Sequence, residues 1–392
     1  MKTVKDLALK GKRVLSRVDF NVPLDEAGNI TSDKRIVAAL PTIKYILEQG
    51  ASLVLMSHLG EPKEGPDPKL SLAPAAKRLS ELLGKPVAML PDCVGPEVEK
   101  RVAAMKPGDV ALLENLRFNK GEKKNSPDFA KQLAALGNVY VNDAFGTAHR
   151  PHASVEAVPR LFKERAAGFL MEKEIKYLSG ALDEPKRPFV AVIGGAKVSS
   201  KIAVLENLIA KVDALLIGGA MAYTFLKAQG HAVGASLVED DKLEVAGEIL
   251  KKAKAEEITF LLPVDHVCGD RFAEDAVVTV TKGVDIPDGL IGLDIGPKTL
   301  ERYAKELKSA GTVVWNGPVG AFEMKPFAKG TFELAKVLAG SGAVSVLGGG
   351  DTASAAKKAG VDGKMTHVST GGGASLEFLE GKVLPGFEAL GD

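Results

Sequence analysis

A chain of 392 residues, 45% apolar and 26% charged, has the size of two ordinary domains and enough apolar side chains for a large core, which excludes a disordered protein. The formal net charge of +1 gives no overall attraction to nucleic acid or to an anionic membrane, so we expect neither as a partner. Cys93 and Cys268 form no disulfide framework or zinc motif, and without a signal-peptide pattern or an apolar run of about 18 residues we expect a cytoplasmic protein.

The first half of the chain alternates predicted strands with predicted helices. Strands are expected at residues 12–22, 51–57, 87–90, 109–118 and 139–144, and helices begin near residues 32, 73, 96 and 127. This alternation predicts a doubly wound parallel sheet with helices on both faces. Ligands of such sheets bind outside the carboxyl ends of the strands, so the residues that follow each strand are candidates for a site.

Polar and charged side chains gather after these predicted strands. They are Asp19, Asn21, His58, Arg117, His149 and Arg150. Arg35 lies in the first turn of a helix, where the dipole disfavours a cation, so it either meets a ligand or is a surface residue beside Asp33. Each residue alone fits a solvated loop, but the set predicts an anion-binding edge. A metal pair at His149 and His152 lacks a third ligand.

A long amphipathic helix is predicted at residues 162–182, between the two halves of the chain. The alternation of strands and helices resumes after it, so the helix separates two sheet domains. We therefore expect a hinge helix near residues 166–182 rather than a flexible linker.

The second half repeats one pattern, a strand that ends in glycines. In PFVAVIGGAKVSSK a buried strand at residues 189–193 leads to the turn at residues 194–197 and then to a helix capped by Ser199 or Ser200. Further copies end in Gly218-Gly219, Gly292-Leu293-Asp294-Ile295-Gly296-Pro297, Asn316-Gly317-Pro318-Val319-Gly320, Gly348-Gly349-Gly350-Asp351-Thr352 and Gly371-Gly372-Gly373. Glycines admit a ligand close to the backbone, and N–H groups at a helix start bind anions. The repeats predict a second doubly wound sheet for nucleotide phosphates, although the first copy alone could be a plain turn with two solvated lysines.

Three kinds of nucleotide-binding motif can be compared with the second half of the chain. A Walker A loop is absent, because no glycine–lysine pair is followed by serine or threonine. Gly348-x-Gly350-x-x-Ala353 matches a dinucleotide fingerprint, but the following strand ends in glycines without an acid for a ribose. Asp351 is either a magnesium ligand in a phosphate loop or only the cap of its helix.

The two halves together indicate a short anionic metabolite on one domain and a magnesium nucleotide on the other. No Ser–His–Asp order or activated cysteine points to covalent catalysis. Phosphoryl transfer needs mainly positioning and charge neutralisation in a water-poor cleft, which two domains on a hinge provide by closing.

In combination, the motifs resemble those of the phosphoglycerate kinase family. They are RVDFNVP from Arg17, SHLG from Ser57, LLENLRF from Leu112, NDAFGTAHR from Asn142, GGAKVSSK, GLDIGP, WNGPVGAFE, GGGDT and STGGGASLEFLEG. They follow the family's order over essentially the whole chain. The resemblance implies reversible transfer of the acyl phosphate of 1,3-bisphosphoglycerate to magnesium ADP, giving 3-phosphoglycerate and ATP in glycolysis, by direct in-line transfer with domain closure.

The resemblance also implies residue roles. The phosphoglycerate would contact Asp19, Phe20, Asn21, Arg35, His58, Leu59, Gly60, Glu61, Arg117 and Arg150. The nucleotide would contact Gly194, Gly195, Ala196, Lys197, Lys201, Gly218, Gly219, Gly292, Leu293, Asn316, Pro318, Val319, Glu323, Gly349, Gly350, Asp351 and Thr352. Asp351 would hold Mg²⁺, and Glu323 the ribose. Arg35, Lys197 and the amides of Gly371 and Gly372 would act on the transferring phosphoryl group, which needs no general base.

One position departs from the family pattern. The family usually reads SHLGRP, and here Glu61 replaces the arginine. An acid on a cationic edge should weaken anion affinity, unless the arginine's role is structural. We therefore expect Glu61→Arg to lower the apparent constant for 3-phosphoglycerate.

The expected organisation is a phosphoglycerate domain at residues 1–165 and a nucleotide domain at residues 166–375, with residues 376–392 packed back on the first. A monomer is expected. Two rival interpretations remain: an NAD-dependent oxidoreductase, which would need a ribose acid and a hydride-site His or Lys, and a two-lobed ligand-binding protein, which is usually exported.

Overall fold

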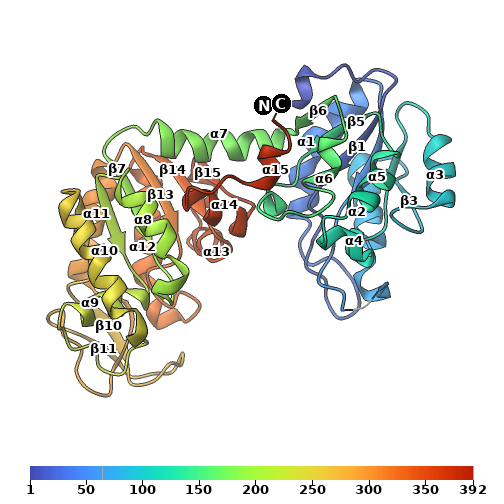
Figure 1. The fold of residues 1–392 in the computed structure, drawn as a ribbon. Helices are drawn as coiled ribbons and strands as arrows, with labels where there is room; N and C mark the ends of the chain where they lie inside the picture. Colours follow the sequence, from blue (N-terminus) through green and yellow to red (C-terminus); the bar gives the residue numbers. More distant parts are fainter. Residues whose placement is uncertain (64, 392) are drawn as a thin grey trace. The chain divides into compact units, whose positions relative to one another are not determined.

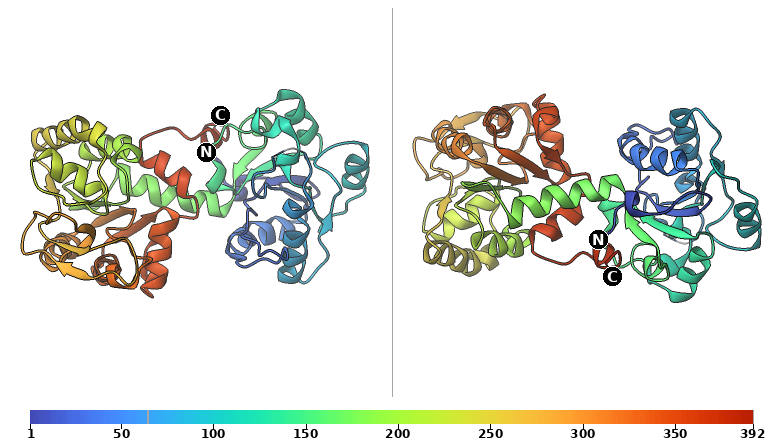
Figure 2. Two further views of the ribbon diagram at one scale, coloured as in Figure 1. Left: turned by 90° about the horizontal axis from the view of Figure 1, so that it is seen from below. Right: turned by 90° about the horizontal axis from the view of Figure 1, so that it is seen from above.

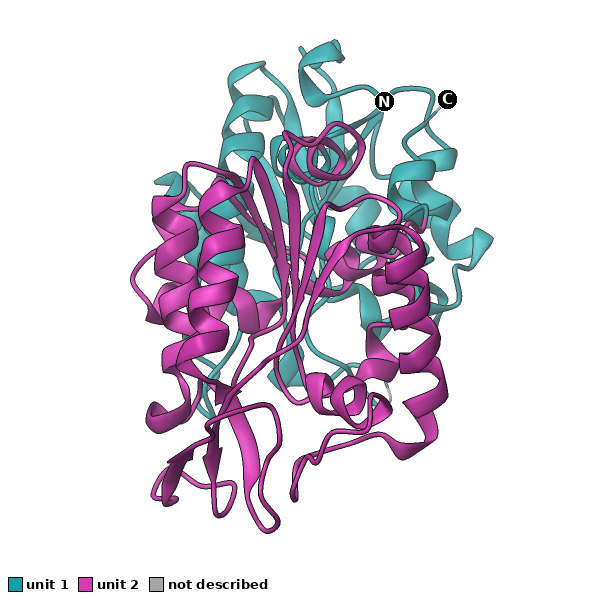
Figure 3. Cartoon of the chain, turned by 90° about the vertical axis from the view of Figure 1, so that its left-hand side faces the viewer, with its two compact units in different colours: residues 1–175, 383–392 teal, residues 176–382 magenta. Residues whose placement is uncertain are grey.

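The computed structural model describes residues 1–63 and 65–391, which form two compact units (Figure 3). Unit 1 comprises residues 1–175 and 383–392, and unit 2 comprises residues 176–382. The last residue of the predicted C-terminal segment 376–392 lies outside the described residues. No described helix is both long and apolar enough to cross a bilayer.

Unit 1 is built on a six-stranded parallel sheet of order β3-β4-β2-β1-β5-β6. Its strands are β1 Arg13–Arg17, β2 Ser52–Met56, β3 Ala88–Met89, β4 Val110–Leu112, β5 Val139–Asn142 and β6 Arg165–Ala167. Its helices are α1 Lys34–Glu48, α2 Ala73–Leu83, α3 Pro96–Ala103, α4 Lys120–Lys123, α5 Pro127–Ala134, α6 Ala157–Arg160 and α15 Pro385–Glu388. Every residue of β2 and β5 is buried, because helices cover both faces of the sheet (Figures 1 and 2).

Unit 2 repeats this plan with strand order β15-β14-β13-β7-β8-β9, again parallel. The strands are β7 Phe189–Ile193, β8 Ala214–Ile217, β9 Thr259–Leu261, β13 Thr312–Asn316, β14 Val344–Gly348 and β15 His367–Val368. The helices are α8 Ile202–Ile209, α9 Met221–Ala228, α10 Leu243–Ala255, α11 Pro297–Ser309, α12 Lys329–Gly340, α13 Gly350–Lys358 and α14 Gly372–Leu379. Helices flank this sheet on both sides in Figure 3. The predicted fold class, two doubly wound α/β sheets, is confirmed.

A small antiparallel sheet in unit 2 corrects one prediction. It has the order β11-β10-β12, with β10 His266–Gly269, β11 Val278–Val280 and β12 Ile291–Ile295. The segment predicted as a glycine loop before α11 is therefore largely strand β12. A Cβ at Gly292 would overlap the ring of Tyr223, so this glycine serves close packing rather than a turn.

The helix α7, Phe169–Asp183, begins later than the predicted start near residue 162 or 166, because β6 occupies residues 165–167. The carboxylate of Asp143 caps the helix: Oδ1 accepts from the N–H groups of Leu170 (2.9 Å) and Met171 (3.2 Å). Burial raises the pKa of Asp143 to about 7, against the opposing effect of its hydrogen bonds. The helix start is thus set by a residue from β5's loop, far away in sequence.

Other element ends also differ from the predictions. The strand predicted at residues 12–22 ends at Arg17, and the one at 109–118 ends at Leu112 and is followed by the 3₁₀ turn Leu116–Phe118. The helix expected to begin at Ser199 or Ser200 begins at Ile202, after the 3₁₀ turn Val198–Ser200. In the first two cases the chain leaves the sheet early, and in the third the helix starts late, so the residues between strand and helix form loops at the strand ends.

From residue 383 on, the C-terminal segment packs on unit 1, whereas residues 376–382, which were predicted to do so too, belong to unit 2. The ring of Phe387 stacks on Phe145 with centroids 5.8 Å apart, and the N–H of Gly386 donates to the carbonyl of Ala148 at 2.8 Å. Arg165 donates to the carbonyl of Gly391. These contacts hold the end of the chain beside the loop that follows β5.

Candidate active site

In unit 1 the loops after β1 and β2 are tied together at the strand ends. Asn21 Oδ1 accepts from the N–H of Gly60 at 2.9 Å, and Ser57 Oγ accepts from the N–H of Phe20 at 2.8 Å. Asp19 accepts a hydrogen bond from Arg35 in the first turn of α1. The cation that the helix dipole disfavours is therefore balanced by an acid from the loop after β1.

The buried Arg17 organises the centre of this edge. Its Nε donates to Ser154 Oγ at 2.8 Å, and its Nη2 lies 3.2 Å from His58 Nδ1. Because the guanidinium is always a donor, His58 Nδ1 must accept, which leaves the proton of the neutral ring on Nε2. Burial, and then the charges of Arg17, Arg117, Arg150 and Arg35, hold the pKa of His58 well below its usual value. His58 is thus a neutral donor surrounded by arginines.

Arg117 lies beside this histidine, with only 2% of its side chain exposed. Its Nη1 donates to the carbonyl of Gly60 at 2.6 Å and also to the carboxylate of Glu61. Arg150 Nη1 lies 3.6 Å from the same carboxylate, and Lys123 donates to its other oxygen. The predicted cations of unit 1 are therefore brought together, and Glu61 lies among them.

Two of these residues were missed by sequence reasoning. Arg17 carries a signal that could have found it, because it ends the buried strand RVLSR, where a buried charge needs partners. Lys123 lies in a run of lysines, KGEKK, that looks like a solvated turn. Only its contact with Glu61, which is 62 residues away in sequence, distinguishes it.

In unit 2 the predicted glycines join the ends of three strands through the main chain. The N–H of Gly194 donates to Asn316 O at 2.9 Å, and that of Gly195 to Pro318 O at 3.1 Å. The N–H of Gly219 donates to Val319 O at 2.9 Å. A Cβ at Gly194 would overlap the carbonyl oxygen of Pro318, so the strand ends can approach this closely only with glycine.

Helix starts supply N–H groups at the same edge. Thr352 is buried in the first turn of α13 and accepts from the N–H of Gly317 at 2.7 Å. Gly349 precedes this helix with φ of 91°, and Gly371 and Gly372 lie at the start of α14. The N–H of Gly371 donates to Ser369 Oγ at 3.2 Å, and the N–H groups at the two helix starts together make an edge that suits phosphate oxygens.

Two lysines and one acid accompany this edge. Lys201 donates to Asn316 Oδ1, and burial lowers the pKa of Lys201 against the attraction of Glu380 and Asp351. Lys197, which follows Ala196 in the glycine turn after β7, is exposed. Asp351 is exposed in the first turn of α13. The described residues hold no cluster of three or more metal-ligand side chains, so a metal here would rely on Asp351 and on oxygens of a ligand.

Two of the residues predicted around the adenosine, Leu293 and Glu323, lie in neighbouring segments. The N–H of Ala321 donates to Leu293 O at 2.8 Å, which places β12 beside the loop that carries Glu323. Glu323 is exposed and lines a hollow of about 430 Å³ together with the rings of Phe322 and Phe332. Four lysines and two further acids also line the hollow, and none of the other residues predicted around the adenosine does.

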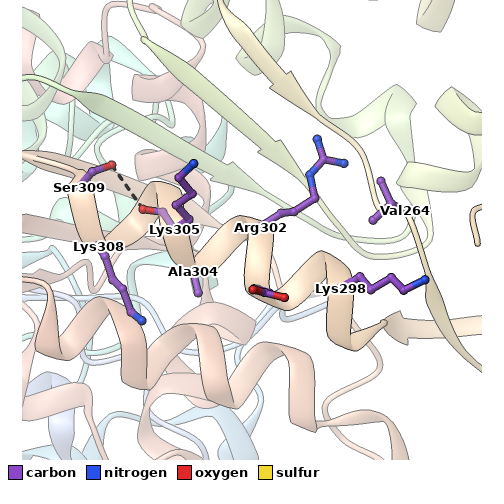
Figure 4. A pocket seen from close by; sticks show the side chains of 8 residues that line it. Val264, Lys298, Arg302, Ala304, Lys305, Lys308 and Ser309 are labelled. Carbon is purple, nitrogen blue, oxygen red and sulfur yellow. Dashed lines mark hydrogen bonds between the residues drawn. The ribbon is translucent and has the colours of Figure 1, made fainter.

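A second hollow in unit 2, of about 890 Å³, lies along α11 (Figure 4). Four cations line it, Lys298, Arg302, Lys305 and Lys308, together with Glu301. None of the residues predicted to bind nucleotide lines it, and its cations stand on an exposed helix face. We therefore use its lysines as positions for control substitutions outside the proposed binding site.

Comparisons with known proteins identify the family of the chain and match its fold. The family described as phosphoglycerate kinase matches residues 4–382. Phosphoglycerate kinases of Anaeromyxobacter sp. (strain Fw109-5) and Chlorobaculum tepidum are 60% and 57% identical, each aligned over 100% of this chain and 99% of its own. The solved structure of phosphoglycerate kinase from Coxiella burnetii is 46% identical with a TM-score of 0.92, covering 99% of this chain and 98% of that one. The enzyme from Pyrococcus horikoshii OT3 is 36% identical with a TM-score of 0.85, covering 100% and 98%.

Proposed function

The chain belongs to the phosphoglycerate kinase family, and from this premise we propose how its two units share the reaction. The enzyme transfers the acyl phosphate of 1,3-bisphosphoglycerate to ADP, giving 3-phosphoglycerate and ATP, and runs in both directions. Family membership gives this activity but assigns no residue to a step. The residue roles, the metal and the motion of the units are our proposals.

The phosphoglycerate binds at the edge of unit 1. The observation that carries this assignment is the set of arginines Arg17, Arg35, Arg117 and Arg150 around the neutral His58. Arginines donate in a fork that matches phosphoryl and carboxylate oxygens. The buried Arg17 positions His58 by donating to its Nδ1. The neutral ring therefore carries its proton on Nε2, which can donate it to the ligand. Asn21 and Asp19 hold the loops on which these groups stand.

The nucleotide binds at the edge of unit 2. The N–H groups at the starts of α13 and α14 receive its phosphates, with Thr352 and Lys201 beside them. Gly218, Gly219 and β12 line the adenosine, and Glu323 accepts the ribose hydroxyls. Close main-chain packing at Gly194 fixes the edge before the nucleotide arrives.

Transfer of the phosphoryl group requires the two units to approach. Arg35 then meets the group from the carboxylate side and Lys197 from the nucleotide side, while the amides of Gly371 and Gly372 neutralise its oxygens. The attacking and leaving oxygens are both anionic, so the step needs no general base. His58 is not suited to that role, because burial and the neighbouring arginines hold its pKa well below its usual value.

We propose Mg²⁺ as the cofactor, bound as the magnesium nucleotide. Asp351 fits this role, because one exposed carboxylate beside a phosphate-binding helix start is the protein's usual share of a Mg²⁺ site. Bound Mg²⁺ neutralises charge on the nucleotide phosphates. We also propose that the enzyme works as a monomer in the cytoplasm.

A coupled assay of 3-phosphoglycerate-dependent ATP consumption tests this function. We expect activity in the unaltered protein and a loss of about 100- to 1,000-fold in kcat for both Lys197→Ala and Arg35→Ala, the usual effect of removing one group that stabilises a transition state. Lys308→Ala, in the hollow along α11, is the matched control and should keep full activity. Activity that survives both site changes would refute the proposed transfer site.

A further inference from the structure

One carboxylate already occupies the cations of unit 1. Glu61 Oε1 accepts from Arg117 and lies 3.6 Å from Arg150, and Oε2 accepts from Lys123. We call these four residues the Glu61 cluster. It spans the loops after β2, β4 and β5, so it assembles only in the folded chain. The same Arg117 and Arg150 are proposed to bind the phosphoglycerate, and the ligand must therefore compete with Glu61.

Arg117 is poorly satisfied by this carboxylate. Both side-chain hydrogen bonds of Arg117, to Gly60 and to Glu61, come from Nη1. Its Nε and Nη2 are buried and find no partner among the described residues. Buried N–H groups without acceptors are costly. A phosphoryl group brings three acceptor oxygens, more than the one Glu61 oxygen that reaches Arg117. The site is therefore built for a ligand with more acceptors than Glu61 supplies.

Glu61 has room to leave. Its side chain is 56% exposed and borders a hollow of about 850 Å³ lined also by Lys63, Pro66, Asp67 and Pro68. The main chain before it is held in place, because the N–H of Gly60 donates to Asn21 and the carbonyl of Gly60 accepts from Arg117. The carboxylate can thus swing away without moving the loop.

The Glu61 carboxylate is not released from its cationic partners by protonation at neutral pH. Burial alone would raise the pKa of Glu61, but the hydrogen bond from Lys123 and the charges of Arg117, Lys123 and Arg150 lower it. Glu61 is therefore ionised wherever the enzyme works, and only another anion can take its place.

We propose that Glu61 is a tethered competitor that weakens anion binding at the cationic edge of unit 1, so that a dianionic phosphoryl group displaces it whereas a carboxylate does so only at high concentration. This inference rests on the proposed binding of phosphoglycerate at this edge. A tethered group acts at an effective concentration of the order of millimolar, so a free monoanion of similar affinity replaces it only above that concentration. A phosphoryl group displaces it because it brings a second negative charge and satisfies the remaining N–H groups of Arg117.

Lys123 receives the displaced carboxylate. It holds Oε2, whereas the arginines hold Oε1, and its side chain is 47% exposed. Glu61 can keep this partner while Arg117 and Arg150 turn to the ligand. Lys123 thus lowers the cost of the exchange without touching the ligand itself.

Glu61→Gln tests the proposal, because glutamine keeps the size of the side chain and removes its charge. We expect the dissociation constants of 3-phosphoglycerate and of inorganic phosphate to fall about fivefold, the size of one partly exposed ion pair. That of glycerate, which lacks the phosphoryl group, should fall by a similar factor, because displacing Glu61 raises the dissociation constant of each ligand alike. The KM for ATP should stay unchanged. Glu97→Gln, whose carboxylate contacts Arg101 on the exposed face of α3, is the matched control and should change none of these values.

A double-mutant cycle tests the role of Lys123. Lys123→Met should weaken 3-phosphoglycerate binding in the unaltered protein and have no effect in the Glu61→Gln background. An equal effect in both would mean that Lys123 contacts the ligand, and would overturn this part of the proposal.

Unchanged or weaker binding to Glu61→Gln would overturn the competitor role and would mean that Glu61 orders Arg117 for the ligand instead. Binding of inorganic phosphate is measured by calorimetry without nucleotide, so its result does not depend on turnover. A protein that binds phosphate as expected but consumes no ATP with 3-phosphoglycerate would refute the proposed function and leave the competitor role supported.

Discussion

The strand-end edges of the two units differ in which groups line them. In unit 1 the edge consists of side chains, with Arg17, Arg117 and Arg150 around His58. In unit 2 it consists of main chain, where glycines such as Gly194 let strand ends touch. Both edges bind anions by our proposal, but the first depends on charge and the second on shape. Substitutions should therefore fail in different ways at the two edges.

The difference follows from what each edge must offer. A small, highly charged metabolite has little surface, so cations that are already desolvated give it most of its affinity. A nucleotide has a base and a sugar as well as phosphates, and helix starts and flat glycine turns contact all three. The cost in unit 1 is buried charge, and the cost in unit 2 is lost backbone freedom at its glycines.

The largest effect should come from adding one methyl group to the main-chain edge. In Gly194→Ala the new Cβ would overlap the carbonyl oxygen of Pro318, which cannot move without disturbing β7 and β13. We expect a loss of about 3 kcal/mol in the free energy of unfolding and a loss of ADP binding. Thermal unfolding and calorimetry measure both.

Gly247→Ala is the control for that change. Gly247 lies in α10 with open space around it, so alanine should stabilise the protein by about 0.5–1 kcal/mol. If Gly194→Ala behaved like this control, the shape argument for unit 2 would fail.

A large effect on the charged edge should come from Arg117→Ala. Removing charge-assisted hydrogen bonds worth about 2 kcal/mol should raise the KM for 3-phosphoglycerate about thirtyfold while the KM for ATP stays the same. Steady-state kinetics with each substrate varied in turn measure this. Arg101→Ala, on the exposed face of α3, should change neither constant. Equal changes in both constants for Arg117→Ala would mean that the two edges do not act separately.

A medium effect concerns stability and pH. The pKa of Asp143 is raised to about 7 in the folded chain from an ordinary value of 3.8, so the unfolded chain loses this proton first as pH rises. The contribution of Asp143 to stability therefore falls between about pH 4 and pH 7 and is level above that. Asp143→Asn keeps an acceptor for the N–H groups of Leu170 and Met171 and removes the titration.

We expect the difference in the free energy of unfolding between Asp143→Asn and the unaltered protein to shift by about 1–2 kcal/mol in favour of the variant as pH rises from 5 to 8. Thermal unfolding of both proteins at the two pH values measures it. Asp25→Asn, at an exposed turn, is the control and should show a constant difference over this range. A constant difference for Asp143→Asn as well would show that the buried carboxyl is ionised throughout.

The smallest effect should come from His58. Because burial and four arginines hold its pKa well below 6.5, its charge does not change between pH 6 and pH 8. We expect His58→Gln, which retains a donor, to raise the KM for 3-phosphoglycerate about two- to threefold, by the same factor at pH 6 and pH 8. Kinetics at the two pH values measure it, and a factor that changed with pH would show that His58 titrates in the folded enzyme.

The sequence by itself determined the fold class and most of the candidate residues. Buried strands followed by glycines or cations are local patterns, and parallel strands bring their carboxyl ends to one edge. This rule was enough to put Arg117 and His58 on one strand-end edge and Gly194 and Pro318 on another, but not to predict which residues touch. Family motifs then gave each residue an expected role, which the proposed experiments test.

Only the tertiary structure decided how these groups pair. The start of α7 depends on Asp143, the strand β12 on pairing with β10, and the state of Glu61 on Arg117, Lys123 and Arg150. Each of these is a contact between residues far apart in sequence, and no local pattern records it. Burial and hydrogen bonding fix the charge of Glu61 and the tautomer of His58, and both exist only once the chain has folded.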